Sequence, residues 1–467
     1  MKNSIIIFTN NLRFEDNKLL SLLQNDKSIL PIYVHDELFF SKPLGSASKV
    51  WLHHSLLDLK NRCPELSFYK GNFVDTVVSL AKKFDISKVV VSEHYFPKEI
   101  QALKQLSHEL NAISCELKCV NTSLLWHPND VLKDDGTPYK VFTPFYRKGC
   151  LGADLPDNPQ SIFLSSFCSD PNSLSLEFLD LLPDHQWAQD MIQDWDISES
   201  GAKKTLDNFL NNGIQRYKEG RDFPALQSVS RLSAYIRFGN ISINTIWHSA
   251  AKLPQSKHVD HFLSELGWRE FSYSLLYHFP TMITNNLQKK FDKFPWKDNA
   301  SLLRAWQKGL TGYPIVDAGM RELWQTGYMH NRVRMIVGSF LVKNLLIHWH
   351  HGEAWFWDCL VDADPASNVA SWQWVAGCGA DAAPYFRIFN PITQGKKFDP
   401  NGDYILRYLP ELENLPKKYL FSPWEAPSEI LKAANIELGK SYPLPIVDLR
   451  ESRELALAAF QSLKETS

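Results

Sequence analysis

The sequence predicts an N-terminal α/β domain with a Rossmann-like parallel sheet, followed by a larger all-α domain. Over residues 1–125, short β-rich runs alternate with amphipathic stretches, which is the pattern of a doubly wound sheet. After residue 200, apolar residues recur with a helical period of about 3.6 and strand-like runs nearly vanish. Between these parts Pro, Asp and Ser accumulate, so we predict a long surface linker with short helical pieces over residues 126–200. The second domain then spans residues 201–467.

Each predicted element rests on its own pattern. The strands are short runs rich in β-branched and aromatic residues: Ile5–Thr9, Leu30–His35, Leu66–Tyr69, Lys88–Ser92 and Ser114–Val120. The helices expected between them are Ala47–Arg62, Val74–Phe84 and Lys98–Leu110. The clearest later helices are Ala202–Lys218, Ile241–Ala251, His258–Tyr277, Ser301–Lys308, Tyr313–Thr326 and Asn331–His350. No G-x-G-x-x-G follows the first strand, so a standard dinucleotide fingerprint is missing.

Length, charge and hydropathy limit the possible functions. A chain of 467 residues is long enough for two or three domains with full cores. Residues 1–200 hold 19 Lys and Arg against 26 Asp and Glu, a net charge of −7, whereas residues 201–467 hold 31 against 26, a net charge of +5. We therefore expect any polyanion to bind the second part. The sequence has no long apolar run and no signal-peptide pattern, so we predict a cytoplasmic protein that does not cross a membrane.

The cysteines and histidines predict no metal centre. The seven cysteines form no C-x-x-C pair, so we expect reduced, mostly structural thiols. The second half holds only Cys359 and Cys378, too few for an iron–sulfur cluster, which needs about four. His348 and His351 lie three apart, but no acid or cysteine completes a metal site at ligand spacing.

The most informative segment is residues 361–391, VDADPASNVASWQWVAGCGADAAPYFRIFNP. Its small residues let the backbone approach a large flat ligand, and its closely spaced tryptophans offer stacking surface. A second segment, residues 228–233 with the sequence SVSRLS, places hydroxyls, N–H groups and a cation at an expected helix start. A diphosphate requires such groups, although an ordinary helix cap would have the same residues.

Residues 361–391 resemble, almost word for word, the flavin-binding core of the DNA photolyase/cryptochrome family. Residues 136–148 (GTPYKVFTPFYRK) and 265–409 also match, and the resemblance covers nearly the whole chain. It is strongest to the class I cyclobutane pyrimidine dimer photolyases. It implies an enzyme, a deoxyribodipyrimidine photo-lyase, in which light-excited reduced FAD passes an electron to a lesion flipped out of UV-damaged DNA.

The resemblance also implies the FAD-binding residues, which are Tyr217, Val229, Ser230, Arg231, Leu232, Ser233, Arg334, Asp362, Ala363, Asp364 and Asn368. The first six match the segment that wraps the diphosphate and adenine side. Arg334 is expected to pair with Asp362 beside the isoalloxazine, and Asn368 matches the position next to flavin N5. Val229 departs from the Thr usual in class I, which puts one hydroxyl contact in doubt. An Asn at position 368 is typical of photolyases and favours repair.

The same comparison implies a lesion pocket. Glu265 is expected to hydrogen-bond the damaged thymine carbonyls and Trp268 to stack on the flipped base. Trp374 forms the opposite wall, with Asn331 and Met335 below. Enzymes for (6-4) photoproducts carry His at these last two positions because opening that lesion needs proton transfer, so the cyclobutane dimer is the predicted substrate. The predicted DNA contacts are Arg221, Glu265, Trp268, Arg269, Asn331, Arg332, Trp374, Lys396 and Lys397.

Two further expectations come from the resemblance. Trp296, Trp349 and Trp372 match the tryptophan relay that carries electrons to oxidised flavin, although each of them alone is also explained by core packing in a chain with 15 Trp. Glu99 aligns with the acid that contacts a folate antenna, while Lys98 replaces the Asn usual before it. We expect an antenna chromophore and favour methenyltetrahydrofolate over a deazaflavin.

The alternative function is a cryptochrome-type blue-light photoreceptor without repair activity. That alternative predicts loss of the pocket residues, yet Glu265, Trp268, Met335 and Trp374 are all present. A flavoprotein oxidoreductase is a third possibility, but no nicotinamide-binding motif accompanies it. We expect a monomer, because a DNA duplex must reach the pocket unhindered.

Overall fold

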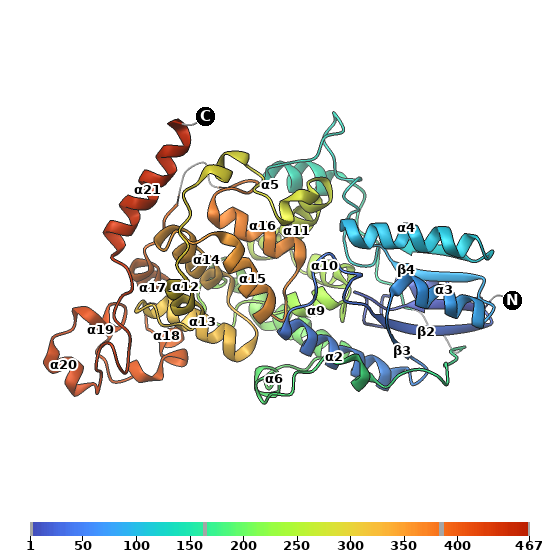
Figure 1. Ribbon diagram of the computed structural model, residues 1–467, viewed down its shortest axis with the longest axis horizontal. Helices are drawn as coiled ribbons and strands as arrows, with labels where there is room; N and C mark the ends of the chain where they lie inside the picture. The colour runs from blue at the N-terminus through green and yellow to red at the C-terminus, as the bar shows by residue number, and fades with distance from the viewer. Residues whose placement is uncertain (1–2, 162–165, 383–386, 466–467) are drawn as a thin grey trace. The chain divides into compact units, whose positions relative to one another are not determined.

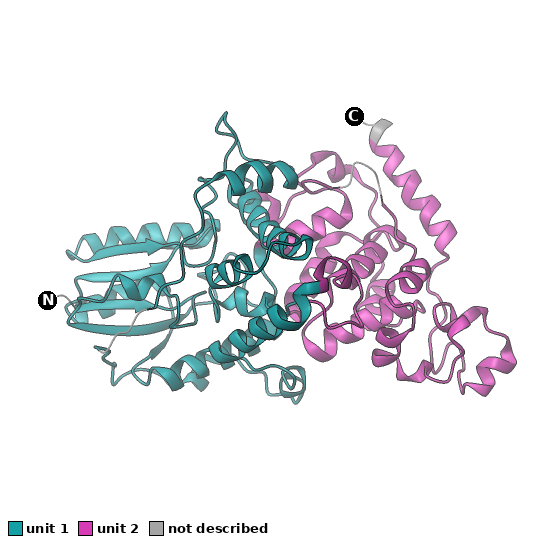
Figure 2. Cartoon of the chain, turned by 180° about the vertical axis from the view of Figure 1, so that it is seen from behind, with its two compact units in different colours: residues 1–215, 230–280, 361–365 teal, residues 216–229, 281–360, 366–467 magenta. Residues whose placement is uncertain are grey.

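The computed structural model describes residues 3–161, 166–382 and 387–465 (Figure 1). Residues 383–386 of the informative segment 361–391 therefore lie outside the described residues. The chain forms two compact units that alternate along the sequence (Figure 2). Unit 1 comprises residues 1–215, 230–280 and 361–365, and unit 2 comprises residues 216–229, 281–360 and 366–467. The domain boundaries at residues 125 and 200 stay a prediction.

Unit 1 contains a five-stranded parallel sheet, as predicted, with the order β3-β2-β1-β4-β5. The strands are β1 (Asn3–Ile7), β2 (Ser28–His35), β3 (Ser67–Lys70), β4 (Lys88–Ser92) and β5 (Glu116–Val120). Ile5 of β1 pairs with Leu30 on one side and with Val89 on the other. The strand order reverses between β1 and β4, and ligands of open α/β sheets bind beyond the carboxyl ends of the strands at such a reversal.

Burial explains why these segments form a sheet. The central strands are apolar on both faces because both faces are covered, which is typical of parallel sheets. Ile5, Ile7 and Val91 belong to one core cluster together with Val77 of α3 and Leu106 of α4. The helices of unit 1 are α1 (Lys18–Ser21), α2 (Ser46–Arg62), α3 (Phe73–Lys83), α4 (Pro97–Asn111), α5 (Phe142–Pro144), α6 (Trp187–Met191), α7 (Glu199–Asn208), α9 (Ser233–Phe238), α10 (Ile243–Ala251) and α11 (Lys257–His278).

Part of the predicted surface linker is core. Phe145 and Tyr146 are only 1% and 4% exposed. The Phe145 ring lies 5.1 Å from the ring of Phe271 on α11. Gly267 makes room on the same helix, because a Cβ there would lie 2.4 Å from the Tyr146 ring. The short helical pieces were predicted correctly, but their aromatic residues pack inward.

Unit 2 is built from helices, as predicted. They are α8 (Tyr217–Gly220), α12 (Ala300–Gln307), α13 (Pro314–Thr326), α14 (Asn331–Ser339), α15 (Trp349–Cys359), α16 (Pro365–Ala376, whose first residue belongs to unit 1), α17 (Pro391–Phe398), α18 (Asp403–Tyr408), α19 (Lys417–Leu420), α20 (Ser428–Ala433) and α21 (Leu449–Glu465). Within the described ranges, no helix is both long and apolar enough to cross a membrane.

Two predicted helices were too long. Asn331–His350 is not one helix, because α14 passes into a π-helical turn (Phe340–Asn344) and Leu346 adopts a left-handed φ of 55°. A new helix, α15, then starts after His348, whose ring accepts a hydrogen bond from the His350 N–H. The other, Ala202–Lys218, is interrupted in the same way, because α7 ends at Asn208 and a π-helical turn follows over Phe209–Gly213.

The π-helical turn in unit 2 buries a lysine. Lys343 is 2% exposed, and its Nζ donates to the carbonyl of Ala376, the last residue of α16, at 3.2 Å. A cation at a helix C-terminus interacts favourably with the helix dipole. Burial nevertheless lowers the pKa of Lys343 to about 7.

We expect Lys343→Met to change how stability depends on pH. The pKa of this amine is lower in the folded state than its ordinary value of 10.5, so the unfolded state binds more protons between about pH 7 and pH 10.5. The wild-type free energy of unfolding should therefore rise, relative to the variant, by on the order of 1 kcal/mol per pH unit above pH 7. Denaturant unfolding at pH 6, 7, 8 and 9 measures this. The exposed Lys308→Met is the control, and parallel curves for wild type and Lys343→Met would contradict the expectation.

Candidate functional site

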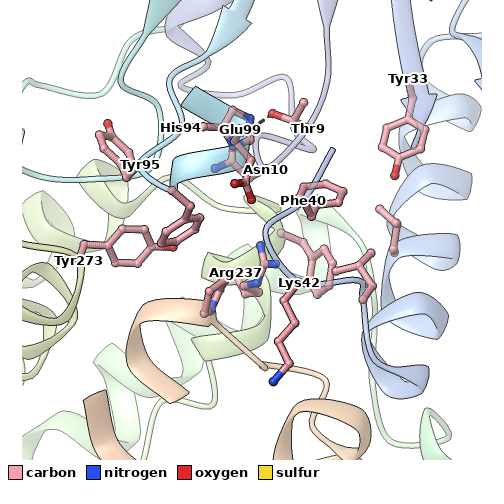
Figure 3. A pocket seen from close by; sticks show the side chains of 15 residues that line it. Thr9, Asn10, Tyr33, Phe40, Lys42, His94, Tyr95, Glu99, Arg237 and Tyr273 are labelled. Carbon is pink, nitrogen blue, oxygen red and sulfur yellow. Dashed lines mark hydrogen bonds between the residues drawn. The ribbon is translucent and has the colours of Figure 1, made fainter. Parts of the chain in front are cut away.

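A pocket opens in unit 1 where the strand order reverses. Thr9 and Asn10 follow β1 and line it, and His94 and Tyr95 do so after β4 (Figure 3). Its empty space is about 630 Å³, which includes open solvent at the mouth. The other lining residues are Tyr33, Phe40, Lys42, Leu44, Leu52, Phe96, Glu99, Arg237, Phe238, Tyr273 and Pro365.

The pocket combines aromatic walls with a few oriented polar groups. Glu99, the predicted antenna residue, is 2% exposed, and its carboxylate accepts hydrogen bonds from the N–H and the hydroxyl of Ser41 at 2.9 and 2.5 Å. Burial raises the pKa of Glu99. Burial lowers the pKa of His94 to about 3, and its buried Nε2 has no partner. Figure 3 shows Glu99 and His94 across the pocket from Arg237 and Lys42. Such a lining suits a planar heteroaromatic molecule with an anionic group.

Two pocket residues also hold the loop that carries predicted FAD contacts. The Nε of Arg237 donates to the carbonyl oxygen of Ala363 at 2.9 Å. The hydroxyl of Tyr273 donates to Oδ2 of Asp364 at 2.6 Å. Ala363 and Asp364 are 1% and 7% exposed, and Asp362 is 9% exposed. Two side chains that line the pocket therefore hold the loop of residues 361–365 in unit 1, which carries the predicted FAD contacts.

The segment SVSRLS begins a helix, as predicted, since α9 starts at Ser233. The Ser230 hydroxyl accepts a hydrogen bond from the Leu232 N–H at 3.4 Å. Arg231 adopts a left-handed φ of 54° and carries its guanidinium over the ring of Trp195 at 4.3 Å. Val229 belongs to unit 2, where Tyr217 is 7% exposed under the guanidinium of Arg221.

In unit 2 the predicted flavin-facing amide is held in one orientation. Asn368 is 8% exposed, and its Nδ2 donates to the backbone and side-chain oxygens of Glu353 at 3.1 and 2.8 Å. The remaining polar atom of this amide, Oδ1, is an acceptor, as the N5–H of a reduced flavin requires. Arg334 donates from Nε to the Met329 carbonyl at 2.7 Å. Its pairing with Asp362 stays a prediction.

Sequence reasoning missed His330. This residue is 3% exposed, and its Nδ1 accepts a hydrogen bond from the Arg332 N–H at 3.2 Å, which places the ring proton on Nε2. That Nε2 is buried and has no partner. Burial, and then the nearby Arg221 and Arg334, lower the pKa of His330 to about 4. A neutral N–H donor beside cations fits an oxygen acceptor of an anionic ligand, and no sequence spacing revealed it.

These donors and acceptors fit FAD. A dinucleotide needs cations and hydroxyls for its diphosphate and an acceptor beside the reduced flavin ring. Unit 1 offers Arg231 and the serines at 230 and 233, and unit 2 by itself offers the unpartnered Nε2 of His330 and Oδ1 of Asn368. The chemistry of these groups therefore agrees with the cofactor implied by the sequence.

The predicted lesion residues fall in both units. In unit 1, Trp268 stacks one ring face on Phe142 at 3.8 Å, and Glu265 lies one turn away on α11 with 26% of its side chain exposed. In unit 2, Asn331 is the exposed first residue of α14, and Met335 receives a hydrogen bond from Arg332 at 3.6 Å. The Trp374 indole donates to the Asp381 carbonyl at 3.1 Å.

Some of the predicted phosphate contacts already form ion pairs or hydrogen bonds within the protein, and others are exposed. Arg332 pairs with Asp222 at 2.6 Å and lies 4.4 Å from the centre of the Phe398 ring. Arg269 stays a predicted contact, but its guanidinium is 13% exposed and donates to the Ser123 carbonyl and to Glu270. Lys396 and Lys397 are exposed in the last turn of α17, where a phosphate can reach them without displacing a buried partner.

The three relay tryptophans all belong to unit 2. The rings of Trp296 and Trp349 both contact the His348 ring, at 5.0 and 5.5 Å. Trp349 is fully buried, and its indole donates to Asn286 at 2.9 Å. Trp372 packs against Gly352 on the helix that begins at Trp349. The electron-transfer role of these residues stays a prediction.

Comparison with known proteins identifies the family. A family model described as DNA photolyase matches residues 4–160, and one described as the FAD binding domain of DNA photolyase matches residues 262–462. A deoxyribodipyrimidine photo-lyase of Agrobacterium fabrum is 44% identical over 99% of this chain and 98% of its own length. Cryptochrome-2 of Arabidopsis thaliana is 32% identical over 99% of this chain and 79% of its own length. The crystal structure of a class III photolyase from Agrobacterium tumefaciens matches with a TM-score of 0.95 and 43% identity over 100% of this chain and 98% of that one.

The chain therefore belongs to the DNA photolyase family. The family, the fold class and the enzyme class predicted from the sequence are confirmed, and the FAD-binding domain supports FAD as the cofactor. The antenna chromophore, the lesion and the individual site residues stay predictions.

Proposed function

We propose that the protein repairs cyclobutane pyrimidine dimers in DNA by light-driven electron transfer. Similarity to the Agrobacterium fabrum deoxyribodipyrimidine photo-lyase over nearly both full lengths carries this proposal. Asn331 and Met335 support the dimer as the lesion, because neither side chain can supply the proton transfer that a (6-4) photoproduct requires. A photoreceptor without repair activity is the second candidate, because a plant cryptochrome is also similar over nearly the whole chain.

The side chains have separate roles in this reaction. Bound FAD supplies the photoexcited electron donor, and the protein orients the reactants and excludes water. Glu265 receives the flipped lesion by hydrogen bonding to its carbonyl oxygens. Trp268 and Trp374 stack on its apolar rings. Asn368, fixed by Glu353, presents an acceptor at the reduced flavin ring.

Repair of defined oligonucleotides under blue light tests the function. Purified, photoreduced protein is given a thymine-dimer oligonucleotide and, separately, a (6-4) oligonucleotide. We expect repair of the dimer only, and a lower repair yield for Glu265→Ala. If neither lesion is repaired although FAD is bound and reducible, the repair function is overturned and the photoreceptor is the candidate that is left.

We further propose that the unit 1 pocket binds the antenna chromophore. Glu99 lies in it, and the aromatic walls, the buried acid and the cations Arg237 and Lys42 suit methenyltetrahydrofolate, whose pterin is flat and whose tail is anionic. Within the family, the similarity to the Agrobacterium tumefaciens structure favours class III over the class I resemblance of the sequence motifs.

Lys396→Ala is expected to weaken binding of damaged DNA through the phosphate backbone. Loss of one phosphate contact should lower the slope of log affinity against log salt by about 0.9, and the effect should be the same for every sequence. Fluorescence anisotropy at several salt concentrations measures the slope. Lys308→Ala changes the exposed lysine that follows α12 and is the control, and an unchanged slope for Lys396→Ala removes this residue from the interface.

A further inference from the structure

We propose that Arg237 and Tyr273 couple the occupancy of the unit 1 pocket to the retention of FAD. Both side chains line the pocket, and both donate hydrogen bonds to the loop of residues 361–365. This inference rests on the proposed roles of Ala363 and Asp364 as FAD contacts and of the pocket as a ligand site. It assigns these residues a positioning role, distinct from light harvesting.

Tyr273 joins the pocket to the loop of residues 361–365 directly, with no residue between them. On the pocket side, Tyr273 packs its ring against Tyr95 and Phe96, with ring centroids at 6.1 and 5.7 Å, and both of these residues follow β4 and line the pocket. On the loop side, its hydroxyl reaches Asp364 at 2.6 Å. A ligand that packs against this aromatic group therefore restricts the donor that orients the Asp364 carboxylate.

Arg237 makes the second connection by a different contact. Its Nε is used by the Ala363 carbonyl at 2.9 Å, so the two terminal nitrogens of the guanidinium are the groups it can offer to an anion in the pocket. The two-sided geometry of a guanidinium allows both contacts at once without a change of rotamer.

The sign of the coupling follows from the shared side chains. A pocket ligand that packs against Tyr273 and pairs with Arg237 stabilises the arrangement in which both side chains donate to residues 363 and 364, and this arrangement holds the loop for FAD. The coupling is therefore positive and reciprocal. We expect a bound pocket ligand to slow the loss of FAD by about fivefold or more, the lower end of typical coupling between sites.

The experiment measures FAD loss from the holoprotein. The FAD-loaded chain is incubated with or without saturating 5,10-methenyltetrahydrofolate, and FAD retained after successive ultrafiltration steps is quantified by extraction. A second series uses 8-hydroxy-5-deazaflavin. Binding of each probe is followed independently by its absorbance in the retained fraction. The result is the ratio of the two FAD loss rates, which does not depend on repair activity.

Three variants show whether the two residues carry the effect. Tyr273→Phe keeps the aromatic wall and removes only the hydrogen bond to Asp364, so the ratio should fall toward one while the probe still binds. Arg237→Met removes the hydrogen bond to the Ala363 carbonyl, and it tests the proposal if Tyr273→Phe folds poorly. Tyr69→Phe is the control, because it removes a comparable tyrosine–carboxylate hydrogen bond, to Asp170 at 2.9 Å, from a residue outside the pocket lining, so it should keep the wild-type ratio.

Each outcome decides the question. A ratio of one with a probe bound, a wild-type ratio in both Tyr273→Phe and Arg237→Met, or failure of both probes to bind overturns the proposal. Failure of dimer repair with an intact ratio instead overturns the proposed function and leaves the coupling standing. Dimer repair together with a ratio of one overturns the coupling and leaves the proposed function standing.

Discussion

Gly352→Ala is expected to lower both the stability of the protein and the light-driven reduction of its oxidised flavin. A Cβ at this position would lie 2.1, 2.4 and 2.6 Å from three carbons of the Trp372 ring. A rigid indole that is 3% exposed cannot give way without moving its neighbours. Overpacking of this kind costs about 1–3 kcal/mol, which exceeds the roughly 0.5–1 kcal/mol that Ala gains over Gly in a helix.

The flavin effect follows from the same displacement. Trp372 is a predicted member of the electron relay, and moving its ring changes the path along which the electron travels. Thermal unfolding measures the loss of stability, and the rate of flavin reduction under blue light with an external donor measures the relay. A variant with wild-type photoreduction despite a shifted Trp372 would remove this residue from the relay.

Gly338→Ala is the matched control. It adds the same methyl group against the same Trp372 ring, but at 3.7 Å, with Val375 at 3.4 Å, which are ordinary contacts. With no clash, the helix propensity of Ala should stabilise the protein by about 0.5–1 kcal/mol. Opposite signs in the two glycine variants would show that distance to the indole, and not loss of glycine itself, controls the effect.

The parallel sheet was predictable because local sequence determines it. Strands such as Lys88–Ser92 are short, continuously apolar runs because both of their faces are buried. The helices between them are amphipathic because each buries only one face. The broken helix after Asn331 was not predictable in the same way. Its interruption depends on the φ of Leu346 and on the cap formed by His348, and both are set by tertiary packing rather than by periodicity.

The candidate site, too, was predictable from the sequence only where the local composition is unusual. Segments with unusual composition, such as residues 361–391, were found because their residue types are rarely needed for packing alone. Arg237 and Tyr273 were not found, since a single Arg or Tyr on a helix carries no signal until the fold brings it to a pocket and a loop. His330 was not among the predicted site residues, because its value as a donor depends on which ring nitrogen caps α14.

Trp349→Phe is expected to abolish photoreduction of oxidised flavin while leaving repair by chemically reduced protein intact. Trp349 is fully buried, and its indole donates to Asn286. Phe keeps most of the packing but removes that hydrogen bond, at a cost of about 1–3 kcal/mol for the acceptor left without a partner. It also removes the easily oxidised indole that contacts the His348 ring at the start of α15, the helix whose Gly352 packs on Trp372.

Trp306→Phe separates these two effects. Trp306 is equally buried, and its indole donates to the Val337 carbonyl at 3.0 Å, so the substitution removes a comparable hydrogen bond from the same unit. Its ring even lies 6.2 Å from that of Trp372, yet it is not a predicted relay member. Similar losses of stability with photoreduction abolished only in Trp349→Phe would mean that electrons follow a defined path through this helical unit. Equal losses of photoreduction would mean that the tryptophans act as a connected aromatic core, in which no single sequence position defines the route.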